Sequence, residues 1–124
     1  MKLNKPSVEI ATAVQDKVEF EERIVGYKLH STAGERKQEL YTLEDVAKFL
    51  HFDDIEQLRQ TGGKGTIGYI DLEILEGWIR DIHGDQELAD AISEISETED
   101  NYQDKMRRTK EAIETRLRQA DEVT

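Results

Sequence analysis

The chain has 124 residues, of which 36% are hydrophobic and another 36% are charged. That length allows one domain with one modest core, and the absence of cysteine excludes disulfides and thiolate metal sites. The 28 acidic residues outnumber the 17 basic ones and give a net charge of −11, which repels nucleic-acid phosphates and anionic lipids. A protein partner with a basic surface, or a second copy of the chain, is favoured instead.

The N-terminal segment contains two lysines with no apolar run behind them, so it does not predict a secretory signal. No stretch of the chain approaches the roughly 18 consecutive apolar residues of a membrane-spanning helix. We therefore expect a cytoplasmic protein that makes no membrane contact. After Pro6, a serine followed by apolar residues at helical spacing predicts a short helix over 7–17.

The next segment has the pattern of a β-hairpin. Apolar residues alternate with other residues from Val25 to Leu29, which is the period of a half-buried strand. Turn-forming residues occupy positions 32–35. The sequence therefore predicts two paired strands over about 24–31 and 36–41.

Two short helices are expected after the hairpin. Thr42 is a good N-cap, and Asp45 stands where a capping-box acid belongs, so a helix is predicted over 43–50. Asp53 begins a second predicted helix, which ends at the glycine-rich turn of residues 62–65.

A short strand over 66–70 leads to an amphipathic helix that begins at Asp71 and stops at Gly84. Trp78 lies in the apolar stripe of this helix, so we expect it in the core rather than at an interface. The complete stripe consists of Leu72, Leu75, Trp78, Ile79 and Ile82.

Beyond Gly84, apolar residues recur at alternating spacings of four and three, as in a coiled coil. We expect this seam to mediate self-association. The residues assigned to it are Leu88, Ile92, Ile95, Tyr102, Met106, Ile113 and Leu117.

Charge along this segment bears on how the seam is covered. Residues 85–104 hold eight acids and no base, whereas residues 105–118 hold six bases and two acids. An antiparallel homodimer would place each acidic half beside a basic half. The same match arises within one chain if the helix breaks near residues 98–101, where Asn101 could cap a new helix. The sequence leaves both arrangements open but favours the homodimer, because arms of about three turns each argue against a stable helical hairpin.

No pattern in the chain indicates a catalytic, cofactor or metal site. The loop at 62–65 lacks P-loop spacing because Arg59 stands where the first glycine belongs, so a plain turn is favoured. His83 lies between Asp81 and Asp85, but spacings of two on a helix point in different directions, so a solvated helix end is favoured. We therefore expect a non-enzymatic protein without cofactor or metal.

Two segments resemble a known DNA-binding module. Residues 40–50 read LYTLEDVAKFL, and they resemble the Y-T-x-x-x-V-A-x-x-L first helix of MerR-type and excisionase-type helix-turn-helix proteins. Residues 68–79 are similar to the wing-and-helix phrase that ends such modules. The resemblance implies a DNA-binding body in which Lys48, Arg59 and Lys64 would contribute to the DNA face. It also implies that a long dimerising helix can follow.

The charge of this region opposes that activity. Residues 40–85 contain ten acids and four bases, and ten minus four gives a net charge of −6. The family's recognition helix would fall on residues 53–60, which carry three of the acids. Because each neutralised phosphate needs a lysine or arginine, the resemblance favours the fold more than the DNA-binding activity.

The sequence thus predicts a mostly helical α+β fold with an N-terminal β-hairpin and a long C-terminal helix or helical hairpin. The expected body spans 1–84, with the hairpin at 24–41 and the helix-turn-helix-like part at 42–82, and the association segment spans 85–124. Of the possible functions, an acidic regulatory or adaptor protein that binds protein partners and itself ranks first. A MerR-type or excisionase-type DNA-binding regulator ranks second, and an acidic mimic or inhibitor of a nucleic-acid-binding protein ranks third.

Overall fold

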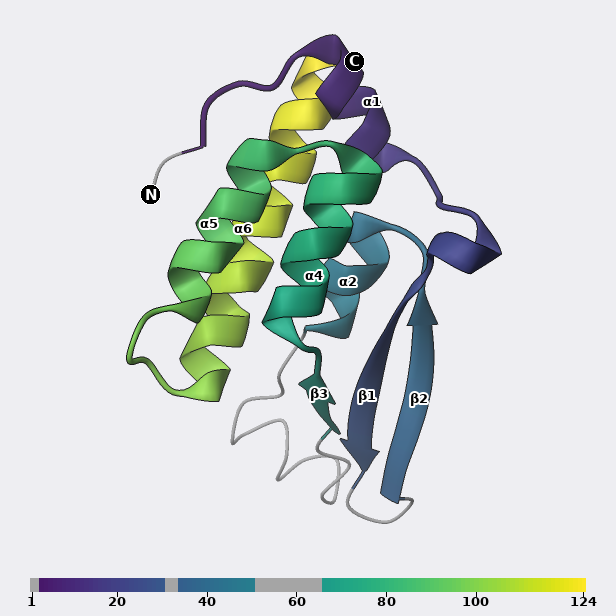
Figure 1. Ribbon diagram of the computed structural model, residues 1–124, viewed down its shortest axis with the longest axis vertical. Coiled ribbons are helices and arrows are strands. Elements are labelled where there is room, and N and C mark those ends of the chain that lie inside the picture. The colour runs from purple at the N-terminus through teal and green to yellow at the C-terminus, as the bar shows by residue number, and fades with distance from the viewer. Residues whose placement is uncertain (1–2, 31–33, 51–65) are drawn as a thin grey trace.

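The computed structural model describes residues 3–30, 34–50 and 66–124 (Figure 1). The predicted helix that begins at Asp53 and the predicted glycine turn lie outside the described residues. Elsewhere the structure confirms the mostly helical α+β fold with an N-terminal β-hairpin and a long C-terminal helix.

Three antiparallel strands form a sheet at one end of the molecule (Figure 1). Strands β1 (Ile24–His30) and β2 (Gly34–Leu40) make the predicted hairpin, in register from Ile24 opposite Leu40 to His30 opposite Gly34. Strand β3 (Thr66–Tyr69), which was also predicted, pairs with the other edge of β1. The order β2-β1-β3 therefore places the first strand at the centre of the sheet.

Helix α2 (Leu43–Phe49) begins with the capping box expected from the sequence. The Thr42 hydroxyl accepts a hydrogen bond from the Asp45 N–H at 2.9 Å, and the Asp45 carboxylate accepts one from the Thr42 N–H at 3.2 Å. At its other end, the buried ring of Phe49 packs onto β1 at Gly26. A Cβ atom at that position would lie 2.5 Å from the ring, so no larger residue fits there.

Helix α1 (Val8–Gln15) lies within the predicted range and is capped by Ser7, whose hydroxyl accepts a hydrogen bond from the Ile10 N–H. Its buried residues, Ala11 and Val14, pack toward α6 (Tyr102–Val123). A short 3-10 turn, η1 (Phe20–Glu22), connects α1 to β1. The first and last helices of the chain therefore lie side by side (Figure 1).

The helix predicted from Asp71 changes its winding before it ends. It runs as α4 (Leu72–Trp78) and continues as a π turn, η2 (Ile79–His83), which stops at Gly84 with φ +71°. A π turn closes hydrogen bonds to the fifth residue, so it rotates the following side chains relative to a regular helix. Ile82, predicted to face the core, is therefore 39% exposed, and that prediction was wrong.

The C-terminal segment is a helical hairpin within one chain, which was one of the two arrangements left open by the sequence. Helix α5 (Gln86–Ser96) ends before the break, and Asn101 caps α6 by accepting a hydrogen bond from the Asp104 N–H at 2.9 Å. The two helices pack against each other, and α6 also packs on α1 and α2. The hairpin is thus part of the body.

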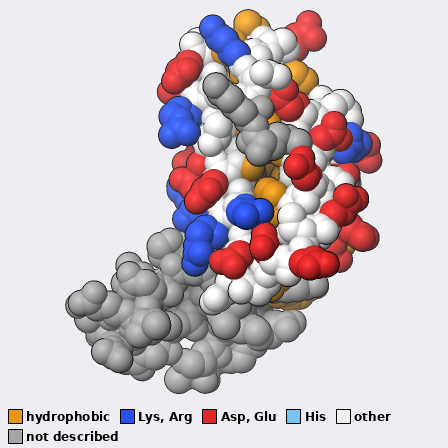
Figure 2. Space-filling model, turned by 90° about the vertical axis from the view of Figure 1, so that its left-hand side faces the viewer, with side chains coloured by type: hydrophobic (Ala, Val, Ile, Leu, Met, Phe, Trp, Pro, Cys, Tyr) orange, Lys and Arg blue, Asp and Glu red, His pale blue; other side chains and the backbone are white. Residues whose placement is uncertain are grey.

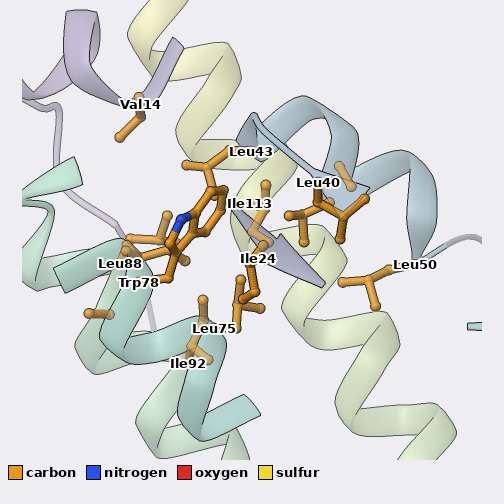
Figure 3. Packing of buried hydrophobic residues seen from close by; sticks show 14 of the residues in the cluster. Val14, Ile24, Leu40, Leu43, Leu50, Leu75, Trp78, Leu88, Ile92 and Ile113 are labelled. Carbon is orange, nitrogen blue, oxygen red and sulfur yellow. The ribbon is translucent and has the colours of Figure 1, made fainter. Parts of the chain in front are cut away.

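One hydrophobic core joins the whole molecule (Figure 3). Leu40 and Leu43 from the hairpin and α2 meet Ile113 from α6, and Leu75 from α4 meets Ile92 from α5. The boundary predicted between residues 84 and 85 therefore lies within a structure that shares one core. Trp78 is buried as predicted, at 7% exposure, and its indole N–H donates to the Glu22 carbonyl.

No helix among the described residues has the length and apolarity needed to cross a membrane.

Candidate protein-interaction surface

Most of the net charge lies in one stretch of the chain. Residues 73–104 contain eleven acids and a single base, Arg80, so eleven minus one leaves −10 of the total −11. This stretch comprises most of α4, then η2, α5 and the connection to α6. Helices α4 and α5 pack against each other, so their outer sides form one surface. We call this surface the acidic face.

The amphipathic pattern of α4 and α5 directs the acids outward. Leu75 and Trp78 on α4, together with Leu88 and Ile92 on α5, point into the core. Acidic side chains on the other sides of the two helices therefore face the solvent. Figure 2 shows one side of this arrangement, with acidic side chains gathered along one margin and mixed charges along the other.

Arg80 joins the two helices of the acidic face. Its guanidinium lies 3.0 Å from the Glu76 carboxylate on α4 and 2.7 Å from the Asp90 carboxylate on α5. It also donates to the Gln86 side-chain oxygen at 2.7 Å. The bond to Asp90, more than any other contact, raises the pKa of Arg80. The only base of the stretch is therefore engaged within the face and is not offered to a partner.

Five acids of the face remain without a bonded partner among the described residues. They carry full negative charge toward solvent, where the approach of a cationic surface would be favoured. These unpaired acids are Glu73, Asp81, Glu94, Glu97 and Glu99. The remaining acids of the stretch make ion pairs or hydrogen bonds, such as Asp100 with Arg108 and Asp104 with Arg107.

The seam predicted to mediate self-association is folded into a single chain. Helix α6 folds back at residues 97–101 and carries the seam against α1, α2 and α5. Within one chain, most of these residues are therefore packed against other elements, and their role in self-association stays a prediction. The fully buried members of the seam are Leu88, Ile92, Met106 and Ile113, and its partly buried members are Ile95, Tyr102 and Leu117.

Of the residues proposed for a DNA face, only Lys48 can be placed. It is exposed on α2, and its ammonium lies 3.1 Å from the Glu44 carboxylate. Arg59 and Lys64 lie outside the described residues, as does the segment that matches the family's recognition helix.

The region around His83 departs from the expected solvated helix end. His83 is 3% exposed and Asp85 is 2% exposed, because the π turn rotates the histidine ring inward beside Trp78. Burial lowers the pKa of His83, which favours the neutral ring. Within the described parts of the chain, no three His, Asp or Glu side chains meet in a way that could hold a metal ion.

Arg116 is the partner of Asp85, and sequence reasoning missed this pair. The guanidinium of Arg116 is 2% exposed and lies 2.8 Å from the Asp85 carboxylate and 2.8 Å from Glu87. It also donates to the Asn4 carbonyl at 2.8 Å, so it ties the N-terminal arm to α5 and α6. Arg116 lies three residues after Ile113 in the predicted seam, and that spacing is the signal that it faces inward.

The acidic face was only partly visible in the sequence. The acids of 85–104 and the excess of acids over 40–85 were both apparent, but they were assigned to separate units. A charge count carried across Gly84 would have found one surface. Neither the family models, nor the curated proteins, nor the solved structures with which the chain was compared include a match to it.

Proposed function

We propose that this chain is a non-enzymatic, acidic regulatory or adaptor protein of the cytoplasm that binds a partner protein through the acidic face. The observation that carries the proposal is the concentration of −10 of the −11 net charge in residues 73–104, on helices that pack side by side. The partner presents lysine and arginine side chains to the unpaired acids.

Two physical properties favour such a role over that of a charged but inert surface. Concentrated charge of one sign accelerates encounters with an oppositely charged partner and rejects partners of the same sign. The face is also built on packed helices joined by Arg80, so its charges are held in place before the partner arrives. Little order is then lost on binding.

We further propose that the helix-turn-helix-like part at 42–82 serves as a scaffold for the face rather than as a DNA reader. The order of α2, β3 and α4 supports a likeness in arrangement to the resembling module. However, α4 contributes to the acidic face, and Lys48 is paired with Glu44. The buried seam gives no support to a homodimer formed through it, so the proposal concerns a different protein as the partner.

The test compares two variants with the same loss of charge. The face variant carries Glu73→Gln, Asp81→Asn, Glu97→Gln and Glu99→Gln, all at exposed positions without bonded partners among the described residues. The control variant carries Glu9→Gln, Glu21→Gln, Asp121→Asn and Glu122→Gln, which are exposed on other elements. Both variants lose four negative charges from three glutamates and one aspartate.

Each protein is immobilised and used to capture partners from a cell lysate at about 0.1 M salt, where the Debye length is about 10 Å. We expect the parent chain and the control variant to retain the same protein, and the face variant to lose it. Elution at about 1 M salt, where the Debye length is about 3 Å, should release it. Equal capture by all three proteins would contradict the proposal, and capture of nucleic acid instead of protein would favour the DNA-binding alternative.

A further inference from the structure

We propose that the groove between α5 and α6 is the docking site for an amphipathic α-helix of the partner, with a leucine-rich apolar side and a basic polar side. This inference rests on the proposed function, because it names the part of the partner that the acidic protein would hold. The groove has a volume of about 610 Å³ and is lined by residues of α5, of α6 and of the N-terminal arm at Leu3.

Two helical ridges form the walls of this groove. On α5, Ala91 and Ile95 lie four residues apart, and on α6, Arg108, Ala112 and Thr115 recur at spacings of four and three. Thr98, just after the end of α5, also lines the groove. Each wall is thus one face of a helix that has no helical neighbour on that side among the described residues. Two antiparallel helices with such faces provide the seat that a third helix occupies in a bundle.

The side chains on the floor are small enough for a helix to approach closely. Alanines occupy the facing positions 91 and 112, and the threonines at 98 and 115 are half-buried. Ile95 is the largest apolar side chain that α5 and α6 contribute to the lining, and it is only partly buried. Packed helices lie about 8–10 Å apart, and small contact residues favour the short end of that range.

The chain itself places a leucine at one end of the groove. Leu3 is 7% exposed and lines the groove, and its carbonyl accepts a hydrogen bond from the Gln119 side chain at 2.8 Å. Leu3 therefore adds an apolar side chain to the lining of the groove. The lining of α6 from Arg108 to Thr115 spans about 10 Å of helix, or roughly two helical turns of a partner.

The charges on the rims select the polar side of the occupant. Glu94 on α5 and Glu111 on α6 stand on opposite rims, and both are exposed without a bonded partner among the described residues. The one base that lines the groove, Arg108, lies 3.0 Å from the Asp100 carboxylate and is thereby neutralised. A helix whose lysines flank an apolar stripe would meet a glutamate on each side.

The probe is a fluorescein-labelled peptide of about 18 residues, made of leucine and lysine with leucines at helical spacing. Its anisotropy is measured against the full chain. We expect saturable binding of one peptide per chain. A scrambled peptide of the same composition, and an amphipathic peptide with glutamate in place of lysine, should each bind about tenfold more weakly or worse, a difference of about 1.4 kcal/mol.

Two groove variants locate the peptide. Thr115→Tyr places a ring in the groove, and Gln15→Tyr places the same ring in the separate hollow between α1, α2 and α6. Each parent side chain takes part in one long hydrogen bond of 3.4 Å, so the two changes are matched. We expect Thr115→Tyr to weaken binding about tenfold and Gln15→Tyr to leave it unchanged. Equal affinity of the two variants for the peptide would overturn the proposal that the peptide binds in the groove between α5 and α6.

A rim variant keeps the test decisive if Thr115→Tyr does not fold. Glu94→Lys with Glu111→Lys changes only exposed positions and should reverse the preference, so that the glutamate peptide binds more tightly than the lysine peptide. If the rim variant still bound the lysine peptide more tightly than the glutamate peptide, the proposal would be overturned.

If the face variant loses the lysate partner while both groove tests fail, the proposed function stands and the groove inference falls. If the groove tests succeed while the face variant captures as the parent does, the acidic-face function fails instead.

Discussion

At the scale of single residues, the buried side chains of His83 and Arg116 have opposite environments. Among the described residues, His83 has no charged partner in direct contact, and its ring lies edge-on to Trp78 with 4.5 Å between ring centroids. Its Nδ1 lies 3.4 Å from the Trp78 carbonyl, while its Nε2 has no hydrogen-bond partner among the described residues. Arg116, by contrast, lies within ion-pair distance of Asp85 and Glu87 and donates a hydrogen bond to the N-terminal arm.

The burial of His83 predicts a stability that depends on pH. Burial is the largest influence on this ring and lowers its pKa below the ordinary value of 6.5, although Asp85, Asp16 and Glu22 act in the opposite direction. As pH falls below 6.5, the unfolded chain takes up a proton that the folded chain resists, so the free energy of unfolding decreases until the lowered pKa is reached. The contribution of His83 to the free energy of unfolding is therefore fully present above pH 6.5, the ordinary pKa.

Urea unfolding at about pH 7.5 and about pH 5.5 measures this effect above the range in which most carboxylates titrate. We expect the parent chain to lose more stability between these two pH values than a His83→Gln variant does. The same loss in both proteins would show that the histidine is not the source.

The buried ion pair predicts a large effect of a single change. Arg116→Met leaves the Asp85 carboxylate buried without its partner, and breaking such a pair typically costs about 3–5 kcal/mol. Asp85 also caps α5 by accepting a hydrogen bond from the Leu88 N–H at 3.0 Å, and asparagine can keep that bond. Adding Asp85→Asn to Arg116→Met should therefore recover part of the lost free energy of unfolding. A double variant less stable than Arg116→Met would contradict this account.

At the scale of elements, local chemistry predicted the helix starts and the hairpin, but packing decided the rest. Thr42, Asp71 and Asn101 all cap helices where the sequence placed them. The π turn was missed because its five-residue bonds leave no mark in a pattern of threes and fours, and it exchanged Ile82 for His83 in the core. Caps act within one turn, so they can be found locally.

The fate of the heptad seam could not be decided locally. The same apolar spacing suits pairing between chains and packing within one chain, and the choice depends on contacts of α6 with α1 and α2, which are distant in sequence. The candidate acidic face was obscured for a related reason. Its charges come from α4 and α5, and only the fold shows that these helices share one core. Composition alone gave the sign of the charge but not its place.

The buried seam predicts how a core substitution acts. Ile92 is fully buried, so Ile92→Ala should lower the free energy of unfolding by about 2–5 kcal/mol through lost contacts and a cavity.

The parent chain should sediment as a monomer at every concentration tested. If Ile92→Ala converted a dimer into a stable folded monomer, the seam would be an interface between chains and the single-chain core would be contradicted.

At the scale of the whole molecule, charge and core are arranged on separate parts of the same helices. The core gathers residues from the hairpin, from α2 and from every later helix (Figure 3). Residues 73–104 hold nearly all of the net charge, while the remaining 92 residues carry 17 acids and 16 bases. A chain that is otherwise close to neutral thus carries one strongly negative stretch.

The most direct test of binding through the acidic face is to measure the affinity for the captured partner as a function of salt concentration and to compare the face variant with the control variant. Both have the same net charge, so only the position of the charge differs. We predict that the parent chain and the control variant bind the partner with similar dissociation constants, which increase as the salt concentration increases. The face variant should bind about tenfold more weakly than either of them at low salt. Equal affinities of the two variants at low salt would contradict the assignment of binding to the acidic face.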